Sequence, residues 1–272
     1  MRRQLLGSCL LACPATAQEA KKDQKGLELG IRADKDRFLL GEPVVLYVTL
    51  RNVGQAPTQV ARLLDPEYDF VKYQVKEPDG DLVPFVPWAI KDHPAPQERL
   101  APGESVQDVA KIFYGGQGWT FQQPGKYEIT ATYQSNVRSN SLAITVVEPE
   151  DRAARRAADL FLGSDEAGRF LLLEGGDHLS GGMRHLKQVV EEFPETPHAN
   201  YANYALGSNL LVDFANFKEN KPAKRSRPAS DYLEKARAKP AGLFIRRERM
   251  PCSSTPTPRR ASGTRPRPHA GT

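Results

Sequence analysis

The chain has 272 residues, with 39% hydrophobic residues, 26% charged residues and a formal net charge of +5. More than 200 residues can bury a substantial core, and this length favours two domains. Only three cysteines are present, and two of them, Cys9 and Cys13, lie in the first 17 residues. This composition argues against a small scaffold held together by disulfide bonds.

Residues 1–17 have the features of a secretory signal peptide. Arg2 and Arg3 give a positive start, a short apolar run follows, and Ala15-Thr16-Ala17 supplies a small-x-small cleavage site. The apolar run is too short to cross a bilayer, which takes about 20 residues, and no later run approaches that length. We therefore predict export to the periplasm or the extracellular space.

A second interpretation of the start remains open. Leu10-Leu11-Ala12-Cys13 resembles the box at which bacterial lipoproteins are cleaved and lipidated. Lipidation at Cys13 would anchor the protein to a membrane surface without changing its fold. A membrane is expected as a partner only in that case.

The basic character of the chain is confined to its C-terminal part. Residues 1–217 contain 23 Lys and Arg against 29 Asp and Glu, whereas residues 218–272 contain 15 against 4. The main domains are therefore mildly acidic, and the pI near 9.0 does not indicate a nucleic-acid partner.

Residues 24–148 predict an immunoglobulin-like β-sandwich of about seven strands. Segments in which apolar and polar residues alternate are typical of antiparallel strands that cover a core from one side. These segments are 27–31, 44–51, 71–75, 106–112, 127–133 and 142–146. Pro-Gly and Pro-Asp-Gly turns separate several of them, as at Pro124-Gly125, and Tyr127 has the place of a buried tyrosine near a strand start.

The opening of this region resembles known modules. The sequence from Asp34 to Val44, followed by Val48-Thr49-Leu50-Arg51-Asn52, is similar to bacterial extracellular Ig-like domains, including proteinase-inhibitor domains of the BsuPI type and macroglobulin-like domains. These residues form turns and core, so the resemblance implies a fold, and proteinase inhibition only by analogy.

Residues 149–249 predict a helical segment. Pro149-Glu150-Asp151 is a helix-start signal, glycines from 175 to 182 predict a break, and helical patterns follow to Phe193 and from Pro197. The residues from Leu186 to Ala199, and later Tyr232 to Ala236, resemble tetratricopeptide-like repeats, in which a proline ends one helix and small residues let the next pack closely. The repeat array is expected to be incomplete.

Residues 250–272 form a basic tail without acidic residues and, from Pro251 on, without Leu, Ile, Val or Phe. Such a composition predicts disorder. Two interpretations stay open, namely a basic arm and a segment produced by a shifted reading frame.

The sequence carries no motif for catalysis and predicts no cofactor. A nucleophile elbow, phosphate loop, dinucleotide fingerprint and zinc-protease motif are all missing from it. His178 and His185 flank a glycine-rich loop without zinc-ligand spacing. Asp65, Glu67 and Asp69 have oxygen ligands at two-residue spacing, yet lack the glycine and distal glutamate of a calcium loop. We interpret these groups as solvated side chains and turn formers, with no metal.

Three aromatic residues are the candidate binding residues. Tyr114 and Trp119 belong to the aromatic, glycine-rich segment 113–121, which either presents a binding surface or, given the alternation of Trp119 and Phe121, packs in the core. Trp88 lies among prolines and is the better candidate for an exposed anchor.

Together these features predict an exported, non-enzymatic binding or scaffolding protein of the cell envelope. Its partner is expected to be another envelope or extracellular protein. The alternatives are a secreted proteinase inhibitor acting through the sandwich loops and a carbohydrate-binding accessory module that uses Trp88 or Trp119.

Overall fold

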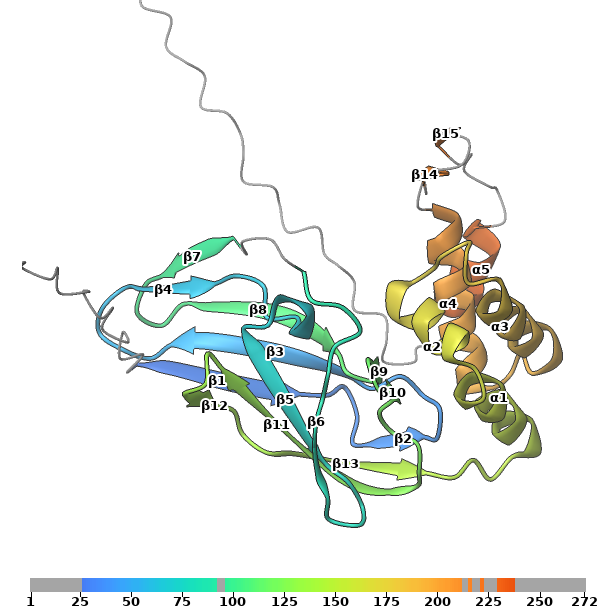
Figure 1. Ribbon diagram of the computed structural model, residues 1–272, viewed down its shortest axis with the longest axis horizontal. Coiled ribbons are helices and arrows are strands. Elements are labelled where there is room, and N and C mark those ends of the chain that lie inside the picture. The colour runs from blue at the N-terminus through green and yellow to red at the C-terminus, as the bar shows by residue number, and fades with distance from the viewer. Residues whose placement is uncertain (1–25, 92–95, 212–214, 217–220, 223–228, 238–272) are drawn as a thin grey trace, which may run out of the picture.

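The computed structural model describes residues 26–91, 96–211, 215–216, 221–222 and 229–237. Within them the chain has a sheet-rich part up to residue 147 and a helical part after it (Figure 1). The predicted signal peptide 1–17, the lipidation candidate Cys13 and the basic tail 250–272 lie outside the described residues.

The first sheet consists of three antiparallel strands in the order β1-β3-β8. Their bounds are Leu27–Arg32, Val45–Asn52 and Ser105–Lys111. Leu50 lies opposite both Leu29 and Val106, so one face of the sheet is apolar and buried. The alternation in the sequence predicted all three strands because each covers the core from one side only.

The second sheet has the strand order β2-β13-β11-β5-β6, and β12 pairs with β11. These strands are β2 (Arg37–Leu39), β13 (Leu142–Val147), β11 (Gly125–Tyr133), β5 (Val71–Lys76), β6 (Leu82–Pro84) and β12 (Val137–Arg138). Strand β2 is parallel to β13, whereas the other pairs are antiparallel. Ile129 lies opposite Val75, and the buried residues of both sheets belong to one hydrophobic core.

Short strands account for the difference from the predicted number. The described part of residues 26–147 contains thirteen strands rather than about seven. The additional ones include two ribbons of two strands each, and a 3-10 helix, η1, lies between β4 and β5. In one ribbon β4 (Thr58–Ala61) pairs with β7 (Gln97–Leu100), and in the other β9 (Tyr114–Gly115) pairs with β10 (Gly118–Trp119). The helix η1 spans Pro66–Tyr68. Two-residue strands are too short to produce a visible alternation.

The helical part lies at one end of the sheets (Figure 1). Its helices α1 to α5 have the bounds Arg152–Leu162, Asp165–Leu173, Ser180–Glu192, Pro197–Leu211 and Ala229–Arg237. The short strands β14 and β15, Ala215–Asn216 and Lys221–Pro222, pair between α4 and α5.

Two predicted helix boundaries were wrong. Helix α1 begins after Asp151 rather than at Pro149, because a carboxylate oxygen of Asp151 accepts a hydrogen bond from the N–H of Ala154 at 2.9 Å and caps the helix there. Gly182 belongs to the first turn of α3 instead of to the predicted break. A carboxylate oxygen of Glu166 in α2 accepts its N–H at 3.0 Å, and this hydrogen bond lowers the pKa of Glu166.

A single hydrophobic core runs from the sheets into the helices. Phe161 and Phe170 of the helical part are fully buried in the same cluster as Tyr114 of β9. At Gly168 the helix α2 comes so close to β9 that a Cβ atom would lie 2.2 Å from the ring of Tyr114. The packing of the two parts therefore depends on a position without a side chain.

We expect Gly168→Ala to destabilise the protein by about 1–3 kcal/mol, because the added Cβ would overlap the buried ring of Tyr114. Helix propensity alone would favour alanine by about 1 kcal/mol, so the sign of the change is informative. Urea unfolding measures it. Gly30→Ala in β1 is the control, since its Cβ would meet nothing closer than 4.0 Å. A neutral or stabilising Gly168→Ala would contradict this packing.

Candidate functional site

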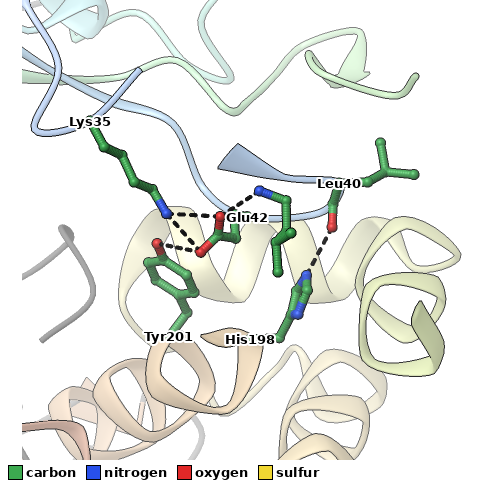
Figure 2. A network of polar contacts seen from close by, with 6 residues as sticks. Lys35, Leu40, Glu42, His198 and Tyr201 are labelled. Atoms are coloured by element: carbon green, nitrogen blue, oxygen red, sulfur yellow. Dashed lines mark hydrogen bonds and ion pairs between the residues drawn. The ribbon is translucent and has the colours of Figure 1, made fainter. Parts of the chain in front are cut away.

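The sheets and helices meet around the turn that joins β2 to β3. Leu40 and Glu42 of this turn contact the helical part (Figure 2), and Gly41 between them approaches α1. Gly41 has a φ of +80°, and a Cβ atom there would lie 3.2 Å from the Cα of Ala158 in α1. Both the backbone conformation and the close approach require glycine. We call this contact the sheet–helix interface.

The centre of the sheet–helix interface is the buried carboxylate of Glu42, whose side chain is 2% exposed. It accepts hydrogen bonds from Lys35 Nζ at 3.0 and 2.9 Å and from the N–H of Leu39 at 2.6 Å. The hydroxyl of Tyr201 in α4 donates a further bond at 3.3 Å (Figure 2). Because burying an unpaired carboxylate is costly, these donors hold the turn in place.

The Tyr201 hydroxyl stays protonated at this interface. Burial raises the pKa of Tyr201 well above its ordinary value, and the negative charge of Glu42 raises it further. A neutral hydroxyl has the proton that the carboxylate needs, so α4 is tied to the sheets by a donor that does not titrate near neutral pH.

His198 of α4 makes the second polar contact. Its Nε2 lies 2.8 Å from the carbonyl oxygen of Leu40 (Figure 2). A carbonyl oxygen only accepts, so Nε2 carries the hydrogen, and Nδ1 has no hydrogen-bond partner among the described residues. Burial lowers the pKa of His198, although the Leu40 hydrogen bond and the charge of Glu42 act in the opposite direction. The imidazole is therefore neutral at pH 7.

Aromatic rings continue this contact through the core. Trp119 stacks on Phe161 of α1 at 6.4 Å between ring centroids, and Phe161 meets His198 edge to face at 5.6 Å. On the other side, Tyr114 lies 5.7 Å from Trp119 and 6.1 Å from Trp88. The structure thus brings the three candidate binding residues into one series of neighbouring rings.

The three candidates differ in exposure. Tyr114 is 2% exposed and Trp119 is 7% exposed, so both pack in the core, as the alternation of Trp119 and Phe121 indicated. Trp88 is 40% exposed, and the guanidinium of Arg169 lies 5.0 Å from the centre of its ring. Of the three, only Trp88 offers substantial ring area to a partner.

A cleft of about 420 Å³ lies beside Trp88, between the sheet-rich part and helices α2 and α4. Phe85, Trp88 and Tyr114 line it from the sheet side, and Leu173 and Tyr204 line it from the helices. We call it the Trp88 cleft. Its volume is within the range of protein binding sites.

Lys111 of β8 lines one end of the Trp88 cleft and joins the strand to the helices. Its Nζ donates to the carbonyl oxygen of Leu172 at 3.0 Å and to Glu174 Oε1 at 2.5 Å. The other carboxylate oxygen of Glu174 accepts from the hydroxyl of Tyr204 in α4 at 3.2 Å. A charged network therefore joins a strand to two helices at the cleft wall.

The other charged wall contains Asp65, Glu67, Lys91 and Asp108. Asp65 caps η1 by accepting the N–H of Glu67 at 2.9 Å, and Glu67 forms an ion pair with Lys91 at 2.5 Å. Burial raises the pKa of Asp65, and the nearby charges of Glu67 and Asp108 add to this effect. Burial would lower the pKa of Lys91, but its bond to Glu67 outweighs this and the pKa is raised.

Sequence reasoning missed Asp108, Lys111 and Glu174. Asp108 had a signal, because it alternates with Val106 and Ala110 on the buried face of β8 and is therefore a charged residue where an apolar one is expected. Its carboxylate accepts the N–H groups of Leu64 and Asp65 at 2.8 and 3.2 Å. Lys111 and Glu174 meet only in the folded chain, 63 positions apart, and no local pattern indicates such a pair.

The acidic residues considered above as calcium ligands contact other groups of the protein. Within the described ranges, no group of three or more His, Cys, Asp or Glu side chains has an arrangement that would hold a metal ion. Asp65 and Glu67 are engaged by a backbone N–H and by Lys91, and Asp69 forms an ion pair with Lys72. These contacts fit the interpretation of the acidic residues as turn formers.

In the part of the chain that the structure describes, none of the helices is both long and apolar enough to cross a bilayer.

Comparisons with known proteins give only distant structural likenesses. No protein-family model matches the chain, and no curated protein matches it. A β-glucosidase from Listeria innocua has 16% identity and a TM-score of 0.29 over 44% of this chain and 16% of its own. One from Erythrobacter marinus has 21% identity and a TM-score of 0.29 over 44% and 15%.

The CARDB domain of a Pyrococcus furiosus protein, determined in complex with di-metal ions, has 17% identity and a TM-score of 0.26 over 44% of this chain and 87% of its own. The chain thus spans about one sixth of the length of the β-glucosidases. TM-scores of this size assign neither a fold nor a function.

We expect Glu42→Ala to destabilise the folded protein by about 2–3 kcal/mol, because Lys35 and Tyr201 lose their buried acceptor. Chemical denaturation gives the value. The control is Glu98→Ala, which removes a pair with Arg62 in which both side chains are 44% exposed, and it should cost less than about 1 kcal/mol. Equal losses in the two variants would show that Glu42 has no special role.

We expect His198 to make stability depend on pH. The unfolded chain takes up a proton near the ordinary pKa of 6.5, whereas the folded pKa is lower. The contribution of His198 to the free energy of unfolding is therefore present above pH 6.5, and it is lost as the pH falls below that value toward the folded pKa. Urea midpoints between pH 5 and 8 measure the slope.

His198→Gln keeps a donor for the Leu40 carbonyl without titrating, so its stability should fall less over this range. His178→Gln, at an exposed position, is the matched control and should follow the unmodified protein. Identical slopes for His198→Gln and the unmodified protein would refute the assignment.

Proposed function

We propose that this chain is a non-enzymatic binding or scaffolding protein that holds an extended segment of another protein in the Trp88 cleft. The carrying observation is a pair of exposed apolar side chains that line this cleft. Trp88 is 40% exposed, and Leu173 is 47% exposed across the cleft. Val86 and Ile90, which flank Trp88 in the sequence, are also exposed, at 43% and 56%. Exposed apolar groups rimmed by charge are typical of protein-binding surfaces.

The polar groups of the cleft fit the same role. Lys111, Glu174 and Tyr204 already satisfy one another, as do Glu67 and Lys91. Such walls are rigid and offer fixed charges at the rim, while Trp88 supplies the apolar anchor. A partner segment can bury Trp88 without first rearranging the cleft, which reduces the entropic cost of binding.

We further propose that the sheet-rich part is an immunoglobulin-like sandwich. The support is Tyr127, which is 2% exposed and whose hydroxyl donates to the carbonyl oxygen of Gln123 at 2.8 Å. A buried tyrosine that bonds back to the backbone just upstream is a hallmark of that fold.

The helical part is proposed to be an incomplete tetratricopeptide-like array. Its support is the close packing of small residues on α4, where Gly207 lies against Leu233 of α5. Export to the cell envelope belongs to the same proposal and is supported by the signal-like residues 1–17.

A carbohydrate ligand is the second candidate for the same cleft. An exposed indole beside carboxylates, as in Trp88 with Asp65 and Glu67, is a combination that stacks on sugar rings and accepts their hydroxyls. Both candidates use Trp88 as the anchor, so the class of ligand that binds separates them, whereas Trp88→Ala should weaken either ligand.

The test is selection of peptides from a displayed random library by the full chain, followed by calorimetry. We expect Trp88→Ala to weaken the selected peptides about 30-fold, which corresponds to losing a hot-spot side chain. Leu82→Ala, which removes an apolar side chain that is 59% exposed but does not line the cleft, should leave binding unchanged. Failure to select any Trp88-dependent peptide would overturn the protein-binding proposal. Retention on a glycan array that is lost in Trp88→Ala would replace it with the carbohydrate candidate.

A further inference from the structure

The lining of the Trp88 cleft suits a segment that contains proline. Four aromatic side chains line this cleft, namely Phe85, Trp88, Tyr114 and Tyr204. Grooves lined by aromatic rings bind proline-rich segments, because the polyproline II conformation is largely formed before binding and loses little entropy. The aromatic lining therefore narrows the extended segment proposed above to one that contains prolines.

The indole of Trp88 already has a cation on one face. The guanidinium of Arg169 lies 5.0 Å from the centre of its ring. A second cation brought to the same ring is repelled by this guanidinium, whereas an uncharged proline ring is not. We therefore expect a proline to contact Trp88, and any positive charge of the ligand to lie elsewhere in the cleft.

The cleft carries more negative than positive charge. Its described charged residues are Asp65, Glu67, Asp108 and Glu174 against Lys91 and Lys111. The lysines pair with the two glutamates. The two aspartates accept backbone N–H groups, which give them hydrogen bonds without cancelling their charge. Both aspartates are half-buried, so an arginine brought to them is screened less by solvent than it would be on an open surface.

One segment of the chain itself has this chemistry. Residues 256–268 read Pro-Thr-Pro-Arg-Arg-Ala-Ser-Gly-Thr-Arg-Pro-Arg-Pro, with four prolines, four arginines and no acidic residue. We call them the Pro-Arg segment, and they lie outside the described residues. Their charge is opposite to that of residues 1–217, which contain 23 Lys and Arg against 29 Asp and Glu. The two regions therefore attract each other.

We propose that the Pro-Arg segment occupies the Trp88 cleft of its own chain and competes there with the partner segment. The inference rests on the proposed function of this cleft. A proline of the segment packs on Trp88, and its arginines pair with Asp65 and Asp108. Partner binding is then regulated by displacement of the chain's own segment, which gives the basic-arm interpretation of the tail a definite site.

The described helices bring the connecting chain close to the cleft. Tyr204 and Ser208 of α4 line the cleft, and Gly207 between them packs against Leu233 of α5. Helix α5 ends at Arg237, 19 positions before the Pro-Arg segment begins. That many residues span up to about 60 Å, whereas the 15-residue α4 is only about 22 Å long. The tether is therefore long enough for docking within one molecule.

Tethering makes a weak contact sufficient. A segment joined by a short linker has an effective concentration of about 1 mM, so an intrinsic Kd of about 0.1 mM fills the cleft in roughly nine molecules of ten. A partner must overcome this competition, and its apparent affinity is lowered about 10-fold.

Acrylamide quenching of tryptophan fluorescence in the full chain tests the proposal. The chain has two tryptophans, and Trp119 is only 7% exposed, so quenching reports mainly on Trp88. We expect the combined variant Arg259→Gln, Arg260→Gln, Arg265→Gln and Arg267→Gln to raise the quenching constant about 2–3-fold at low salt, because the released segment no longer covers the indole. Raising the salt concentration from about 50 to 500 mM should produce the same rise in the unmodified chain.

The matched control removes four arginines that precede the Pro-Arg segment, by Arg225→Gln, Arg227→Gln, Arg246→Gln and Arg247→Gln. It should leave the quenching constant unchanged, and Trp88→Phe should abolish the response to salt. The proposal is overturned by equal quenching in the unmodified chain and the tail variant, by an equal rise in the control, or by a rise that persists in Trp88→Phe. Quenching that depends on protein concentration would place the segment in the cleft of a second copy and would also overturn it.

A second measurement separates this inference from the proposed function. Peptides selected on the Trp88 cleft should bind the tail variant about 10-fold tighter than the unmodified chain, because the competing segment is gone. Equal affinities, measured by calorimetry, would overturn self-docking and leave the proposed function standing. Absence of any Trp88-dependent peptide from selections on both chains would overturn the proposed function, whereas the quenching experiment needs no partner peptide.

Discussion

The arrangement of the protein depends on one carboxylate that has been removed from water. Glu42 is tolerated in the interior because donors from its own turn, from Lys35 and from Tyr201 surround it. Separating the helices from the sheets would leave its charge short of a partner and would expose His198. The polar contacts of Glu42 therefore fix how the helices are oriented on the sheets, whereas apolar burial supplies most of the free energy of the interface.

The proposed binding surface also depends on how the two parts of the chain meet. The Trp88 cleft combines walls from β8, α2 and α4, so neither part contains the complete surface by itself. The aromatic series from Trp88 through Tyr114 and Trp119 to Phe161 keeps the spacing between the parts fixed, because rings packed in a core have few alternative positions.

The long strands could be predicted from sequence because the alternation in β3 and β11 is produced by burial on one face only. Helix α1 could be predicted for a similar reason, because its buried residues recur at helical spacing. The interface was not, since Glu42 and Tyr201 stand 159 positions apart and each has an ordinary local context. Trp88 could be singled out by its prolines, but the cleft beside it is made by Lys111 and Glu174, which meet only in the folded chain.

The distance along the chain between Leu40 and His198 has a consequence for biosynthesis. These partners are separated by 158 positions, so the turn leaves the ribosome long before the helix that covers it. At ordinary rates of roughly 5–20 residues per second, the delay is about 10–30 s. The sheet that contains β2 can be complete only after Val147, so for about the last 50 residues of this interval the sheets present Glu42 and the adjoining apolar residues to water without the helices. The interval is long enough for a chaperone to occupy the turn until the helices are made.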